Sequence, residues 1–364
     1  MSGKLAIKLV ERRGSLQHKS RVIFFVHNTI LWASEPLQML VEALLLGHKA
    51  GQLSGDVHYS FTNMQVVLQT CYVAGQSFDI VQKNILDFLS ILQMNDMQIF
   101  FKYSLLLLSQ IMVLKEGLHM SGVAHMDNMP TEGEILAHAS SGPSVFAHGK
   151  LHHLTRAFLF RKLDNASLNI DISGEFAESH HQLTPLYLFG YFIEGLTSFL
   201  LARESNDNIE SANWIERGQS VLAKMQYWSE HSQWNWENKM LLLKAESMHT
   251  KGEFDRAGKL YDDSIRSARD HKFIHEEAIS SELAGIFYYE RGSRQKSYLC
   301  LVHSLKSYKE WGAHAVAKRV EMDMRGYFGT DIDQFKCSAD TSLENLFASS
   351  QGSRKKRHEG GGVG

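Results

Sequence analysis

Apolar residues recur along most of the chain at intervals of three and four, the spacing of one face of an α-helix. In residues 18–49 this pattern is divided by Pro36. A proline is tolerated in the first turn of a helix, so the pattern predicts one helix ending near Ala33 and a second beginning at Glu35. A third helix is predicted to end at Ala74. The other predicted helices are residues 78–94, 97–117, 148–160, 166–180, 185–204, 209–230 and 312–327.

The four prolines divide the chain into regions. None occurs after Pro185, and a proline inside a helix costs about 3 kcal/mol, so the C-terminal half is predicted to be continuously helical. Helical periodicity fails over residues 118–144, where clusters of serine, glycine and proline predict a loop or hinge. The predicted regions are an N-terminal extension (1–17), a helical-hairpin array (18–117), this loop (118–144), a repeat array (145–328) and a disordered tail (329–364).

The sequence pattern of a helical hairpin occurs twice between residues 241 and 305. Small and apolar residues of the first copy recur in the second at a constant offset of 40, since 285 − 245 and 304 − 264 give the same number. Such units cannot bury their apolar faces alone and must stack on one another, so the repeat predicts an all-α solenoid of stacked hairpins. The matching pairs are Ala245 and Gly285, Gly252 and Gly292, Ala257 and Ser297, Tyr261 and Leu301, and Ser264 and Ser304.

The repeat resembles a tetratricopeptide repeat, although its unit is longer than the usual length of about 34 residues. The stretches Leu260-Tyr261-Asp262, Glu276-Glu277-Ala278 and Trp311-Gly312-Ala313 are similar to one family in particular. This is the helical-repeat region of very large signalling proteins, which lies between an ATPase module and a sensor histidine kinase, often after a serine/threonine kinase-like domain. The resemblance implies a tetratricopeptide-like fold and a role in signalling.

The catalytic motifs of such proteins are missing from the sequence. It contains no GxxxxGK[ST] phosphate loop, no His-Arg-Asp kinase loop and no Asp-Phe-Gly,. The chain is therefore expected to be a non-catalytic interaction or regulatory module that binds a protein or peptide partner. The alternative is a regulatory fragment of a multidomain ATPase or sensor kinase whose catalytic domains are absent from this chain.

Composition limits the partners and the compartment. The formal net charge is −2 and charged residues make up 21%, so no global field attracts nucleic acid and none is predicted as a partner. Three well-separated cysteines fit a reducing compartment, which predicts a cytoplasmic protein. The basic run from Arg354 through Lys355 and Lys356 to Arg357 leaves a nuclear location open. The apolar stretches 22–33 and 103–114 are shorter than the roughly 20 residues of a membrane span.

Nineteen histidines raise the question of a metal site. His148 and His152 have the spacing of one helix face, but two imidazoles alone do not make a zinc site, and no HExxH motif occurs. Buried or solvated histidines are the simpler interpretation. No metal and no other cofactor is predicted.

The predicted binding site is the concave face of the repeat array. In tetratricopeptide arrays the first helix of each hairpin lines this face, and a mixed polar and apolar groove suits a peptide. An equally weighted alternative is that Glu246 and Glu282 cap or bridge neighbouring helices. The predicted groove residues are Lys239, Leu242, Glu246, His249, Ile279, Glu282, Ile286 and Tyr289.

Overall fold

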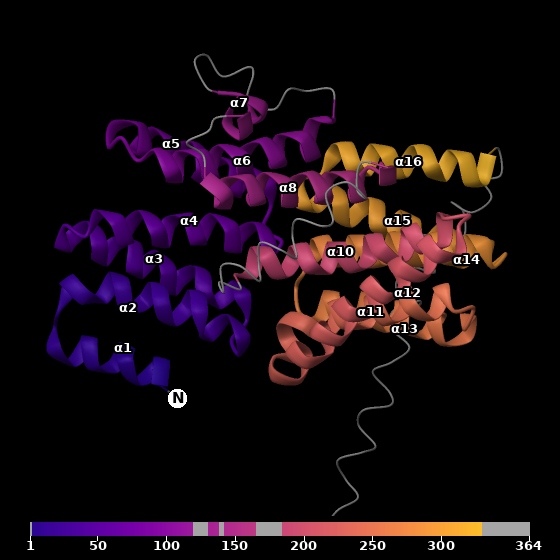
Figure 1. Cartoon of the computed structure of the whole chain (residues 1–364), viewed down its shortest axis with the longest axis horizontal. Helices are drawn as coiled ribbons and strands as arrows, with labels where there is room; N and C mark the ends of the chain where they lie inside the picture. Colours follow the sequence, from indigo (N-terminus) through magenta and orange to yellow (C-terminus); the bar gives the residue numbers. More distant parts are fainter. Residues whose placement is uncertain (1, 119–129, 138–141, 165–183, 330–364) are drawn as a thin grey trace, which may run out of the picture.

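The chain is entirely helical wherever its structure is described. The computed structural model describes residues 2–118, 130–137, 142–164 and 184–329. These residues form fifteen α-helices and no β-strand (Figure 1). The all-α prediction is confirmed. The helix predicted over 166–180 and the tail beyond Gly329 lie outside the described residues.

The first third of the chain forms an N-terminal array of six α-helices. They are α1 (Ser2–Arg13), α2 (Leu16–Thr29), α3 (Leu37–Ser54), α4 (Val57–Val73), α5 (Phe78–Met94) and α6 (Gln98–Glu116), with the 3-10 turn η1 (Leu31–Ala33) after α2. Residues 1–17, predicted as an extension, contain α1 and the start of α2. Gly3 explains this packing, because a Cβ placed there would lie 2.9 Å from a side-chain atom of Val26 in α2.

Two helices occupy the described part of the predicted loop over 118–144. Helix α7 spans Glu132–Ala137, and α8 (Gly142–Leu159) begins before the loop was predicted to end. A capping box starts α7: the Thr131 backbone N–H donates to Glu134 Oε2 at 2.7 Å, and the Glu134 N–H donates to Thr131 Oγ1 at 3.3 Å,. This cap stabilises a helix that is too short to show apolar periodicity.

The second half forms a C-terminal array, whose six helices follow α10 (Pro185–Glu204). Four successive helices each end at a turn that contains a residue with the left-handed backbone conformation: Gly252, Lys272, Gly292 and Gly312. Their spacing is 20 residues, so one helix with its turn takes 20 residues and one hairpin takes the 40 seen in the sequence. The six helices are α11 (Asn208–His231), α12 (Gln233–Thr250), α13 (Phe254–Asp270), α14 (Ile274–Glu290), α15 (Arg294–Trp311) and α16 (His314–Phe328).

The inner helices of the N-terminal array pack against α8, α10 and the last helix of the C-terminal array. Helix α4 lies against α10, and α6 lies against α8 and α16 (Figure 1). At one end of the junction the Asn235 side-chain amide donates to the carbonyls of Trp32 (3.0 Å) and Glu35 (2.7 Å), and its Oδ1 accepts from Leu37 N–H at 3.1 Å. The indoles of Trp32 and Trp236 meet edge to face beside it, 5.9 Å apart.

At the other end of the junction the turns themselves are in contact. Trp311 packs on Phe78, with ring centroids 4.3 Å apart, and Gly312 lies directly against Phe78. Gly75 has the same role toward His275, since a Cβ on Gly75 would lie 2.6 Å from His275 Nδ1. The two arrays therefore share one continuous hydrophobic core.

Candidate functional site

Most of the predicted groove residues lie in the interior. Helix α10 packs along α12, and Arg161 after α8 and Arg319 of α16 reach Glu282 in α14, which the sequence repeat alone does not reveal. The prediction of an exposed groove is therefore wrong for six of the eight residues, while Ile286 and Tyr289 are partly exposed. The six buried residues are Lys239, Leu242, Glu246, His249, Ile279 and Glu282.

Lys239 forms a fully buried ion pair with Glu276. Its ammonium lies 2.8 Å from Glu276 Oε2 and donates to the Asn235 carbonyl at 2.7 Å. Burial lowers the pKa of Lys239. Burial alone would raise the pKa of Glu276, but Lys239 and His275 hold it below its usual value. The rings of Phe273 and Trp236 flank the ammonium, so this pair belongs to the core.

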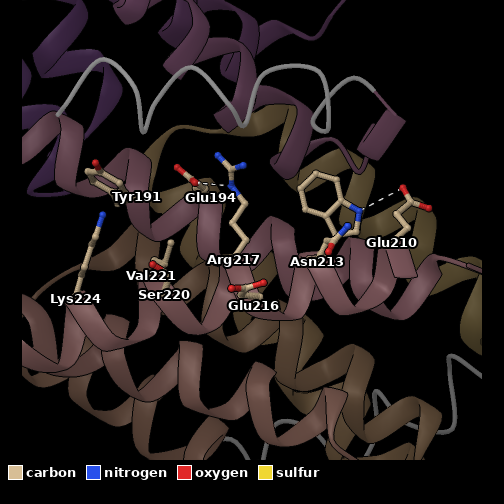
Figure 2. Close-up of a pocket in the computed structure, with 10 residues that line it drawn as sticks. Tyr191, Glu194, Glu210, Asn213, Glu216, Arg217, Ser220, Val221 and Lys224 are labelled. Atoms are coloured by element: carbon tan, nitrogen blue, oxygen red, sulfur yellow. Dashed lines mark hydrogen bonds and ion pairs between the residues drawn. The ribbon is translucent and has the colours of Figure 1, made fainter. Parts of the chain in front are cut away.

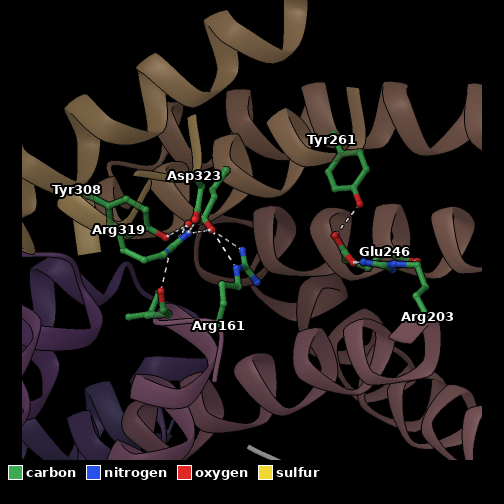
Figure 3. A network of polar contacts seen from close by, with 9 residues as sticks. Arg161, Arg203, Glu246, Tyr261, Tyr308, Arg319 and Asp323 are labelled. Atoms are coloured by element: carbon green, nitrogen blue, oxygen red, sulfur yellow. Dashed lines mark hydrogen bonds and ion pairs between the residues drawn. The ribbon is translucent and has the colours of Figure 1, made fainter. Parts of the chain in front are cut away.

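Glu246 bridges three helices rather than facing a groove (Figure 3). Its carboxylate accepts from Arg203 of α10 at 2.6 Å and from the Tyr261 hydroxyl of α13 at 2.5 Å. Burial would raise the pKa of Glu246, but the nearby Arg203 and His249 outweigh it and lower that pKa. His249 itself lies 3.0 Å from Glu290.

Glu282 has the same role with more partners, and Figure 3 labels three of them, Arg161, Tyr308 and Arg319. It accepts from Arg161, which follows α8, at 2.6 Å, from Arg319 of α16 at 2.7 Å and from the Tyr308 hydroxyl at 2.9 Å. Although burial opposes ionisation, the two guanidinium groups lower the pKa of Glu282 to about 2. Arg319 also donates to the Leu159 carbonyl at 2.8 Å. These contacts agree with the alternative in which Glu246 and Glu282 bridge neighbouring helices.

An exposed pocket of about 550 Å³ lies between α10 and α11 (Figure 2). Close packing of the two helices forms its floor, since a Cβ on Gly195 would lie 2.7 Å from the side chain of Val221. Sequence reasoning missed this site because it carries no repeat signature. Its lining residues are Tyr191, Glu194, Glu210, Asn213, Trp214, Glu216, Arg217, Ser220, Val221 and Lys224.

Both charge signs and two aromatic rings meet in this pocket. Glu194 lies 2.8 Å from Arg217 Nε, which balances a carboxylate that is almost completely buried. The Trp214 indole donates to Glu210 at 3.3 Å, and the Lys224 ammonium lies 4.8 Å from the Tyr191 ring centre. Such a surface can hold a side chain against an aromatic ring while charged groups orient the backbone or the charges of a ligand.

The structure also places the histidines considered as metal ligands. His148 Nδ1 lies 2.8 Å from the Ser144 carbonyl and Nε2 lies 3.2 Å from Gln69 Nε2. Burial lowers the pKa of His148 to about 4 and takes that of His152 well below its usual value. Across the described ranges, no group of three histidine, cysteine or carboxylate side chains is placed to hold a metal ion.

Comparison with known proteins does not assign the chain to a family. No known family profile matches the chain, and no curated protein matches its sequence. Two described helices, α6 and α10, are long and apolar enough to cross a membrane, but 67% and 89% of their apolar windows are buried inside the protein. Core helices of this fold have the same composition.

Proposed function

We propose that this chain is a non-catalytic, tetratricopeptide-like solenoid that binds a polypeptide partner as a regulatory module in cytoplasmic signalling. Three features support the solenoid: the hairpin length of 40 residues, its division into two units of 20, and the small residues at helix contacts such as Gly285 against Leu301. The resemblance to the helical-repeat region of large signalling proteins supports the signalling role.

The proposed docking site is the pocket between α10 and α11. The observation that carries this choice is accessibility, because six of the eight predicted groove residues are buried whereas this pocket is open to solvent among the described residues. An aromatic side chain such as Trp214 between charged groups is typical of the residues that dominate binding energy at interfaces. A peptide with one apolar side chain next to a charged residue would match it.

Peptide selection on the intact protein tests the site. A displayed library of random peptides should yield binders whose affinity falls about tenfold or more with Trp214→Ala. The matched control is Tyr227→Ala, which removes another aromatic ring of α11 that is 61% exposed but does not line the pocket. Unchanged binding by the Trp214 variant, or an equal loss in both variants, would refute the assignment.

The alternative reading, a regulatory part of a longer kinase or ATPase, has its own test. Sequencing of the transcript across both ends would show whether the reading frame continues into a phosphate loop or a histidine-kinase core. A reading frame that stops at both ends of this chain would exclude this alternative.

A further inference from the structure

Helix α3 carries an exposed apolar row on its outer side. Met39, Leu46 and Leu53 are 63%, 59% and 67% exposed. Residues seven apart in an α-helix are separated by two full turns minus about 20°, so they lie nearly above one another. The three side chains therefore form one row about 21 Å long. Three large apolar side chains exposed in line on one helix exceed the scattered exposure normal for a surface.

The row is exposed to solvent because of the way α3 packs on its neighbours. Helix α3 packs mainly on α2, η1 and α4. Its neighbours α2 and α4 also pack on each other, and α4 in turn contacts α10. Helix α3 thus lies outside this inner layer, and it meets the C-terminal array at its first turn, where Leu37 and Gln38 bond to Asn235, Trp234 and His271.

Two opposite charges accompany the row, one on each side of Leu46 along the helix. Glu42 and Lys49 are both exposed, and neither has an ion-pair partner among the residues that the structure describes. Glu42 precedes Leu46 by four residues and Lys49 follows it by three. Along the helix axis these steps are about 6 Å and 4.5 Å.

We propose that α3 pairs with α3 of a second copy of this chain, antiparallel, with Leu46 on the two-fold axis. Met39 of one copy then lies opposite Leu53 of the other, since each is seven residues from Leu46. Glu42 lies within about 1.5 Å, along the axis, of Lys49 of the other copy. A parallel pair would place each charge opposite its own kind, which disfavours that arrangement.

The exposed area indicates a weak dimer. The row is a patch on the order of 300 Å² per copy, and a helix pair of this size falls below the roughly 1,200 Å² that marks the weak class of interface. We expect a dissociation constant on the order of micromolar or higher. This inference is independent of the pocket on α10 and α11.

Cysteine cross-linking tests the geometry, in a Cys337→Ser background because Cys71 and Cys300 are buried. Leu46→Cys should form a disulfide-linked dimer under mild oxidation. Leu53→Cys alone should not, because the two copies of residue 53 lie about 21 Å apart, but a mixture with Met39→Cys should.

Sedimentation of the full chain tests the charges. Glu42→Lys should weaken the dimer about tenfold, and the double variant with Lys49→Glu should restore it, because the exchange preserves the two pairs. A chain that stays monomeric at several hundred micromolar would overturn the proposal. So would equal cross-linking at positions 46 and 53, or no rescue by the double variant.

Discussion

Glu282→Gln is the substitution that best tests whether the predicted groove residues hold neighbouring helices together in the interior. Glu282 is 1% exposed, and its carboxylate pairs with two guanidinium groups, those of Arg161 and Arg319. The amide keeps the shape of the side chain but removes the charge. Arg161 and Arg319 then lose the carboxylate between them, although Arg319 keeps its pair with Asp323 at 2.9 Å, and the contact of α14 with the end of α8 and with α16 is weakened.

The expected loss follows from the pKa of Glu282. A fall from 4.5 to about 2 corresponds to about 3 kcal/mol of stability at neutral pH. Removal of one member of a buried ion pair typically costs about 3–5 kcal/mol. The side chains of Arg161 and Arg319 are 20% and 14% exposed and can turn partly toward water, which favours the lower figure.

Urea unfolding followed by circular dichroism measures this loss. The matched control is Glu321→Gln, which removes an exposed pair with Arg325 and should cost less than about 0.5 kcal/mol,. Because the folded pKa of Glu282 is depressed, its contribution is complete above pH 4.5 and is lost as the pH falls toward 2. The gap between wild type and Glu282→Gln should therefore close over that range. A gap below about 1 kcal/mol at pH 7, or one independent of pH, would refute the reasoning.

Three further predictions concern the junction of the arrays and the core. Gly55→Ala should lower the free energy of unfolding in urea by about 1 kcal/mol, because alanine is strained at its left-handed φ of 75°,. Gly75→Ala has a similar φ of 78° but also places a Cβ against His275, so it should cost clearly more,. Equal losses in the two variants would contradict the contact between Gly75 and His275. Asn235→Ala should speed hydrogen exchange at the Leu37 amide, and unchanged exchange would contradict that bond. Burial raises the pKa of the Cys71 and Cys300 thiols to about 12, so in a Cys337→Ser background neither should react with a thiol reagent at pH 8 until urea is added,; rapid labelling of the folded protein would contradict their burial.

The sequence predicted helices well wherever apolar residues recur with helical spacing. The repeat also placed its turns correctly, because Gly252 and Gly292 supply the left-handed conformation that ends a helix,. Helix α7 was missed because its stability comes from a two-residue cap at Thr131 and Glu134, which is a local signal in a segment rich in breakers.

The site was harder to predict because burial in this protein depends on contacts between distant segments. Glu246 and Glu282 lie on the first helix of a hairpin, where the repeat places a concave face. Nothing near them in sequence shows that Arg203 of α10 and Arg161 after α8 cover that face. The pocket at Trp214 likewise exists only because α10 and α11 pack closely, through glycines that a sequence shows as ordinary helix residues.

The most direct test of the account is to find where a bound peptide lies. A peptide selected on the intact protein, carrying a photoreactive group beside its apolar residue, should cross-link to α10 and α11 between Tyr191 and Lys224. Adducts on the buried side of α12 or α14, near Glu246 or Glu282, would contradict the account, because they would show that this buried face opens to bind the peptide.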